Sequence, residues 1–175
     1  MKQNGFTLLE LIVTMAIAAI VLTVAVPSFQ GIIRNNRIAS HTNDFTSSLN
    51  LARSEAVKRA RRVVLCKSTD SASCDTSSAG WEQGWIVFVD IDNDAAVDSD
   101  DEILRVYGAP EGVETITGNT NITNYISYTQ QGFTRLTSGA FQAGTLTFSL
   151  CDSQNKKREI VINSMGRPKL NQPDC

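Results

Sequence analysis

The chain has 175 residues, which is enough for one globular domain and one additional segment. Its mean hydropathy of −0.11 excludes a protein with many membrane spans, and its net charge of −2 gives the whole chain no electrostatic reason to bind nucleic acid. The charges are segregated, however: residues 1–62 carry eight basic and three acidic side chains, residues 63–102 carry one and ten, and residues 151–175 carry five and three. Any anion-binding surface is therefore expected to be local.

The first element is an apolar segment, residues 5–29, with a single carboxylate at Glu10. A cleaved secretory signal would need a small-residue cleavage site after it, and no good site follows. A plain transmembrane helix needs about 20 apolar residues, but it has no use for a buried charge, which is costly in a membrane. A cut after Gly5 gives a third interpretation, because Phe6 would then carry a positive α-amino group and Glu10 would lie one helical turn later. In a bundle of identical helices, a neighbour's N-terminus could pair with this carboxylate.

Gly5, the following Phe6-Thr7-Leu8-Leu9-Glu10 and the apolar run together resemble the class III signal of type IV pilins and pseudopilins. The resemblance implies cleavage after Gly5 and N-methylation of Phe6 by prepilin peptidase. It implies storage in the inner membrane as a single-pass protein with a periplasmic domain, followed by assembly with other major and minor pilins into a type IV pilus. Glu10 would guide assembly by docking to the N-terminus of the preceding subunit. The expected parts are a leader (1–5), a transmembrane and filament-core half of the helix (6–30) and a periplasmic globular domain (31–175).

The helix is expected to continue beyond the membrane, from about Phe6 to about Arg61. Pro27 removes a backbone donor and is expected to kink or loosen it. Past Gly31, apolar residues recur at helical spacing and form one amphipathic stripe: Ile38, Phe45, Leu49, Ala52 and Ala56. Basic residues crowd the last turns: Arg53, Lys58, Arg59, Arg61 and Arg62. Since cations suit the negative end of the helix dipole, a capping role is favoured over phosphate contact.

Beyond residue 62 the pattern changes to strands rich in β-branched and aromatic residues. The expected strands are 62–66, 85–89, 103–107, 125–128, 145–150 and 159–162. No second helix has a convincing period. The predicted fold class is therefore α+β: a long N-terminal helix, apolar in its first half, packs on the antiparallel β-sheets of a C-terminal globular domain.

Four cysteines, Cys66, Cys74, Cys151 and Cys175, allow three pairings. They lack the C-x-x-C spacing and the chain has a single histidine, His41, so no zinc site is expected. If the domain is exported to the oxidising periplasm, these cysteines would be oxidised to disulfides. Cys66 and Cys74 are close enough to close a small loop, and a bridge from Cys151 to Cys175 would hold a terminus that otherwise frays. The predicted pairs are therefore 66–74 and 151–175.

Four runs of residues narrow the resemblance to the FimT/FimU branch of the GspH family of minor pilins, with the FimT type favoured. They are ARSEAVKR (52–59), VLC (64–66), GWIVF (84–88) and INSMGR (162–167). The resemblance covers essentially the whole chain. It implies a domain of two packed β-sheets against the C-terminal half of the helix. Members help to build or prime pili, and FimT-type members are implicated in DNA uptake during natural transformation.

FimT proteins that bind DNA resemble one another in a Gly-Arg-x-Arg stretch near the C-terminus. Gly166 and Arg167 match it, but Lys169 stands in place of the second arginine and keeps only a point charge for phosphate. Pro168 favours an extended backbone at Arg167, so the two cations can project the same way. Three further cations are expected on the preceding turn and could join them: Lys156, Lys157 and Arg158. The alternative is a solvated basic hairpin tip.

Asp90, Asp92 and Asp94 have the alternate spacing of calcium ligands in an EF-hand loop. Ala95 occupies the place where that loop needs glycine, and the stretch follows a strand rather than a helix. A polar loop without a metal is therefore favoured over a calcium site. No nucleophile elbow, nucleotide loop or Cys/His pairing is present, so the chain is predicted to be no enzyme and to need no cofactor.

The favoured function is that of a minor type IV pilin. Its basic C-terminal tip would bind double-stranded DNA without sequence preference and support DNA uptake in natural transformation (competence). One alternative is a structural minor pilin of the FimU kind, which primes pilus assembly through protein contacts. Another is a GspH-like pseudopilin of a type II secretion system.

Overall fold

The computed structural model describes residues 7–113, 115–150 and 156–173, with Leu150 and Lys156 described by their backbone alone. The chain divides into two compact units, residues 1–36 and 37–175. In the described residues, the helix α1 belongs to both units, and a 3₁₀ turn and eight strands follow it. Their bounds are α1 Leu8–Arg59, β1 Arg62–Lys67, η1 Trp81–Gln83, β2 Gly84–Asp90, β3 Glu102–Gly108, β4 Thr115–Gly118, β5 Tyr125–Tyr128, β6 Gly144–Leu150, β7 Lys156–Ile162 and β8 Pro168–Asn171.

The α1 helix has 52 residues and continues through Pro27. It ends two residues earlier than the basic run suggests, because Ala60 adopts a left-handed conformation with φ of 50°. The amide of Ala60 donates to the carbonyl of Val57 at 3.4 Å, and the amide of Arg61 donates to the carbonyl of Ala56 at 3.3 Å. These two bonds form a Schellman motif, usually built on glycine, and they satisfy carbonyls that the helix end leaves open.

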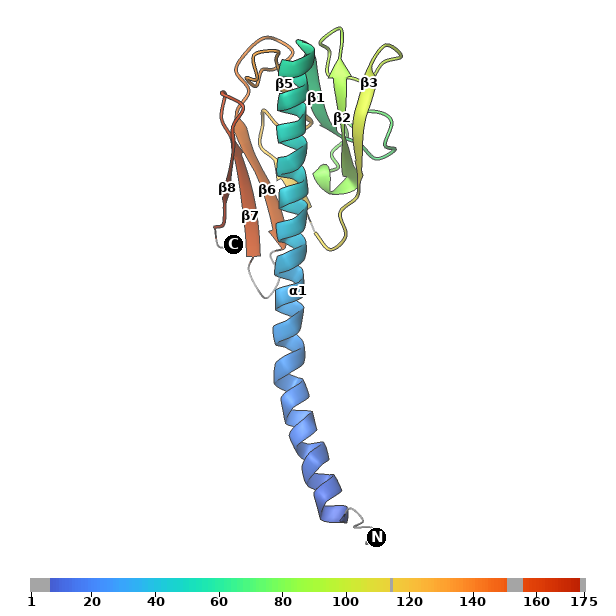
Figure 1. The fold of residues 1–175 in the computed structure, drawn as a ribbon, viewed down its shortest axis with the longest axis vertical. Helices are drawn as coiled ribbons and strands as arrows, with labels where there is room; N and C mark the ends of the chain where they lie inside the picture. Colours follow the sequence, from blue (N-terminus) through green and yellow to red (C-terminus); the bar gives the residue numbers. More distant parts are fainter. Residues whose placement is uncertain (1–6, 114, 151–155, 174–175) are drawn as a thin grey trace. The chain divides into compact units, whose positions relative to one another are not determined.

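The globular unit contains two antiparallel sheets and the C-terminal half of α1 (Figure 1). One sheet has the strand order β3-β2-β1-β5 and the other β4-β6-β7-β8. The predicted α+β class is confirmed. Sequence reasoning missed the short strands β4 and β8, which lie at edges of the second sheet.

The main core lies between the helix and the two sheets. All five residues of the predicted helical stripe are buried, from Ile38 to Ala56. Phe45 lies at the centre, with ring centroids 4.9 Å from Trp85, 5.3 Å from Trp81 and 5.8 Å from Phe148. Trp85 belongs to β2 and Trp81 to the 3₁₀ turn directly before it, whereas Phe148 belongs to β6 of the other sheet. One helical side chain therefore joins both layers.

A second, smaller core lies on the other face of β1 and β2. It consists of Val64, Cys66, Ile86 and Phe88. Its presence explains why all seven residues of β2 are buried: both faces of this strand are covered, so its hydrophobic run does not alternate.

The loop after β1 lies against this second core and carries the disulfide between Cys66 and Cys74, as predicted. The buried Lys67 donates from Nζ to the carbonyls of Ser77 and Ala79, each at 2.6 Å. These bonds satisfy an ammonium group that burial would otherwise disfavour. The other predicted pair, Cys151 and Cys175, lies outside the described residues and stays a prediction.

Within this loop, Asp70 accepts hydrogen bonds from the Ser73 hydroxyl at 2.6 Å and from the amides of Ala72 and Ser73 at 2.9 and 2.8 Å. The Ser68 hydroxyl donates to the same carboxylate at 3.1 Å. The Ser73 hydroxyl bond is the largest of the causes that hold the pKa of Asp70 well below its usual range. Since the bonds favour the ionised form, the loop is best ordered when Asp70 is charged.

Replacing Phe45 should strongly destabilise the globular unit. Phe45→Ala would leave a cavity among three aromatic rings, and we expect a loss of about 3–5 kcal/mol in the free energy of unfolding. Val57→Ala is the matched control, because Val57 lies on the same helix and is 53% exposed; it should change stability by less than about 0.5 kcal/mol. Urea titration of the full chain in non-ionic detergent measures both. Equal losses would contradict the central role of Phe45.

Asp70→Asn should lower the Tm at pH 7, because the amide nitrogen cannot accept the hydrogen bonds that the carboxylate accepts. The pKa of Asp70 is lower in the folded state than in the unfolded state, so its contribution is present above the unfolded value of about 3.9 and is lost as pH falls through the folded value. The Tm difference between wild type and variant should therefore shrink on acidification. A difference that is constant with pH would show that ionised Asp70 does not stabilise the loop.

Candidate functional site

The C-terminal tail, residues 163–169, begins with a tight turn between β7 and β8. Gly166 donates from its amide to the carbonyl of Asn163 at 2.8 Å, and its φ of +71° is a left-handed conformation. A Cβ added at Gly166 would lie 2.5 Å from the carbonyl oxygen of Gly132 and 2.8 Å from Cε1 of Tyr128. Glycine is therefore required both by the turn and by the neighbours that pack against it.

Arg167 and Lys169 follow this turn and are both exposed. The amide of Arg167 donates to the side-chain oxygen of Asn163 at 3.1 Å, which fixes the start of β8. Lys169 lies opposite Val161 of β7. Because side chains alternate along an extended chain, Arg167, the residue just before β8, is expected to point to the same side as Lys169. No ion pair to either cation occurs among the residues that the structure describes.

The other three predicted cations do not lie on a turn, so that part of the prediction is wrong. Lys156 begins β7, and its side chain lies outside the description. Lys157 forms an ion pair with Glu159 at 3.3 Å. Arg158 lies opposite Phe148, so its side chain starts on the face of the sheet that carries the core.

The β7 strand also separates Lys157 from the tail. Lys169 pairs with Val161, four residues beyond Lys157 along β7, which corresponds to roughly 13 Å at the rise of a β-strand. Strand alternation puts Lys157 on the same face as Lys169. Along β7, however, Glu159, which forms the ion pair with Lys157, lies between Lys157 and the position opposite Lys169. Sequence reasoning placed these cations together because it could not see where β7 begins.

Most cations at the end of α1 have structural partners. Arg59 contacts Glu55 and Glu102, each at 2.6 Å, and Lys58 contacts Glu55 at 3.3 Å. The hydrogen bond from Arg59 is the main cause that lowers the pKa of Glu55. Arg62 donates to the Ser127 hydroxyl at 2.7 Å, beside a polar cavity of about 320 Å³. These contacts favour the structural role expected for this cluster.

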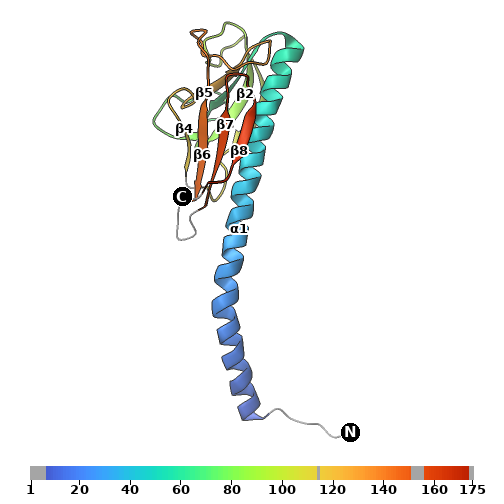
Figure 2. The ribbon, with the colours of Figure 1, turned by 90° about the vertical axis from the view of Figure 1, so that its left-hand side faces the viewer.

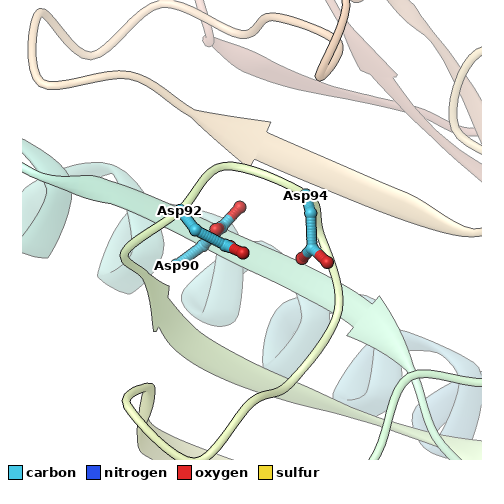
Figure 3. A group of neighbouring side chains, drawn as sticks. All are labelled: Asp90, Asp92 and Asp94. Atoms are coloured by element: carbon cyan, nitrogen blue, oxygen red, sulfur yellow. The ribbon is translucent and has the colours of Figure 1, made fainter.

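The acidic loop after β2 brings three carboxylates together (Figure 3). Asp90, Asp92 and Asp94 each offer an oxygen, and these oxygens lie within 4.8 Å of one another. Asp90 is buried and accepts from the amides of Asn93 at 2.6 Å and Ala95 at 3.2 Å. Its carboxylate therefore closes the turn by hydrogen bonds, although burial raises its pKa. That this polar loop binds no metal ion stays a prediction.

Charge repulsion is also felt further along this loop. The nearby Asp94 is the main cause that raises the pKa of Asp98, with desolvation next. Ala95, which stands where a calcium loop needs glycine, nevertheless has a φ of 63°. The backbone thus follows a tight turn that the residue type does not predict.

The N-terminal unit contains the apolar part of α1. The helix includes a stretch long and apolar enough to cross a membrane, and that stretch is unburied within the chain. Gly5 and Phe6, the predicted cleavage site, lie outside the described residues. At the start of the helix, Thr7 Oγ1 accepts from the amide of Glu10 at 3.3 Å, and Glu10 Oε2 accepts from the Thr7 amide at 3.4 Å.

This reciprocal pair is a capping box, in which a threonine and a glutamate three residues later satisfy free amides of the first turn. Sequence reasoning assigned Glu10 to assembly alone and missed the cap, although the T-x-x-E pattern of Thr7 and Glu10 was present. The carboxylate therefore has a partner within its own chain, and the intermolecular partner stays a prediction.

Comparison with known proteins agrees with this architecture. The family model of the type II transport protein GspH matches residues 41–166, and the model of the prokaryotic N-terminal methylation motif matches residues 1–26. No curated protein matches the chain by sequence.

Two solved structures share the fold, both of the type IV minor pilin FimU from Pseudomonas aeruginosa in different crystal forms. The first is 17% identical with a TM-score of 0.61, and the match covers 79% of this chain and 94% of the FimU chain. The second is 17% identical with a TM-score of 0.53, and the match covers 77% and 96%. Since the GspH model spans most of the chain and the N-terminal methylation motif covers the start of the chain, this chain belongs to the family of the type II transport protein GspH.

Proposed function

We propose that this chain is a minor type IV pilin that binds double-stranded DNA through Arg167 and Lys169 and thereby supports DNA uptake in natural transformation. The observation that carries the proposal is the pair of exposed cations on the edge strand β8 and its preceding turn. Arg167 can bridge two phosphate oxygens with its guanidinium, and Lys169 adds a point charge. Phosphate contacts carry no base information, so binding should be indifferent to sequence.

The affinity is expected to be weak, since two cations neutralise few phosphates and non-specific binding has dissociation constants of roughly 10⁻⁴–10⁻⁶ M. The acidic stretch of residues 63–102 opposes a broad footprint. The second candidate is a purely structural role of the FimU or GspH kind, and the shared fold with FimU is the observation that favours it.

The methylation motif supports a second part of the proposal. We infer that prepilin peptidase cleaves the chain after Gly5 and methylates Phe6, and that α1 anchors the chain in the inner membrane with the globular unit in the periplasm. From there the chain would join a type IV pilus, with Glu10 docking to the N-terminus of a neighbouring pilin. Thr7 would hold the carboxylate until that N-terminus arrives.

Two variants separate the cap from the docking contact. Glu10→Ala removes both, and we expect it to be processed but absent from sheared filaments. Thr7→Ala removes the hydroxyl that caps the helix but keeps the carboxylate, so it should still assemble. Immunoblots of sheared pili and intact-mass measurement of the mature chain give the two readouts. Normal assembly of Glu10→Ala, or a retained leader on the wild-type chain, would contradict the proposal.

Substitution in the tail should weaken DNA binding without loss of fold. Arg167→Gln should cost more affinity than Lys169→Gln, because it removes the bidentate contact, and the double variant should lose most binding and reduce transformation while pili still assemble. Fluorescence anisotropy of a labelled duplex, titrated with full-length chain in non-ionic detergent at several salt concentrations, measures this. Each lost phosphate contact should reduce the steepness of log K against log salt by about 0.9.

Lys157→Gln is the matched control. It removes one positive charge from the same sheet face, but from a side chain already paired with Glu159. Its binding should equal that of the wild type. If the wild type shows no salt-dependent binding, or if the double tail variant binds as well as the wild type, the structural role replaces the DNA-binding one.

A further inference from the structure

The tail turn packs on a loop that in turn packs on the end of α1. The loop follows β5 and is closed by the amide of Gly132, which donates to the carbonyl of Thr129 at 2.8 Å. The Tyr128 hydroxyl donates to the carbonyl of Gly166 at 3.3 Å, and the amide of Thr134 donates to the carbonyl of Ser164 at 3.3 Å. Loop and turn are therefore fixed to each other by hydrogen bonds from both ends of the loop.

Arg53 of α1 lies directly on this loop. A Cβ added at Gly132 would lie 3.1 Å from Nε of Arg53 and 3.3 Å from Cγ2 of Val57. The carbonyl oxygen of Gly132 in turn lies against Gly166, 2.5 Å from the position that a Cβ there would take. Gly132 and Gly166 have no side chains, so only two layers of backbone separate Arg53 from the turn that carries Arg167.

Arg53 differs from its neighbours in the basic end of α1. Lys58 and Arg59 are paired with carboxylates, and Arg62 donates to the side chains of Asn93 and Ser127. Arg53 is half-buried, and within the described part of the chain no carboxylate forms an ion pair with it. Its charge is felt by Tyr128, whose pKa is raised mainly by burial and slightly lowered by Arg53. A guanidinium without an acidic partner can bind a phosphate.

We propose that Arg53 is a third phosphate-binding cation, so that DNA bound at the edge strand β8 also contacts α1 beyond that edge. This inference rests on the proposed DNA-binding function. Both views show the β7–β8 turn at the end of the globular unit where α1 ends (Figures 1 and 2). The exposed Gln130 and Gln131 of the intervening loop add neutral donors to this surface, which can bond phosphate oxygens without reading sequence.

The test is the salt dependence of duplex binding by full-length chain in non-ionic detergent. Arg53→Gln should weaken binding severalfold and reduce the steepness of log K against log salt by about 0.9, one phosphate contact. Arg53→Lys keeps the charge and should retain the wild-type salt dependence. Arg105→Gln is the matched control, since Arg105 is exposed on β3, an edge strand of the other sheet, where its guanidinium lies over Tyr107.

The outcomes are distinguishable. If the tail variants lose binding but Arg53→Gln keeps the wild-type salt dependence, the third cation is wrong and the proposed function stands. Arg53 is likewise a merely structural residue if Arg53→Lys loses binding as fully as Arg53→Gln and both variants melt earlier than the wild type. If the double tail variant binds like the wild type, the DNA-binding function itself is wrong, and the role of Arg53 falls with it.

Discussion

One face of α1 is buried between two sheets, and the rest of the globular unit depends on this burial. Phe45 contacts an aromatic ring from each layer, and the Trp85 indole donates to the Ser48 hydroxyl at 2.9 Å. An apolar stripe on a helix is unstable in water unless something covers it. In the described residues the two sheets have no strand in common. The helix is therefore the element that both sheets cover.

Hydrogen bonds also connect the two layers near the β7–β8 turn. Tyr128 belongs to β5 of one sheet, and its hydroxyl bonds the turn that follows β7 of the other. The side chain of Gln142 accepts from the amide of Ser127 at 2.9 Å and donates to the carbonyl of Tyr125 at 2.9 Å. The position of the tail therefore follows from contacts made across the layers, and the cations on it inherit a rigid support.

Hydrophobic periodicity in the sequence correctly predicted the elements whose apolar residues are buried. The stripe from Ile38 to Ala56 is one such part, and β2 is another, since a run of seven buried residues is typical of a strand covered on both faces. The short strand β8 could not be found in this way, because it has four residues, begins with Pro168 and lies at an edge. Sequence also could not tell which cations have partners: the distance from Lys157 to Glu159 and the position of Arg53 on Gly132 depend on pairing register and on contacts between distant segments.

The loop after β1 is closed by two kinds of bond. Two sets of hydrogen bonds, from Lys67 to the carbonyls of Ser77 and Ala79 and from the loop to Asp70, close it without help from sulfur. The covalent ring joins residues only eight positions apart, and closing so short a loop changes chain entropy modestly. The same hydrogen bonds hold the backbone on either side of Cys74 in the place where its sulfur meets that of Cys66. The disulfide therefore adds a covalent closure to a loop that these hydrogen bonds close as well.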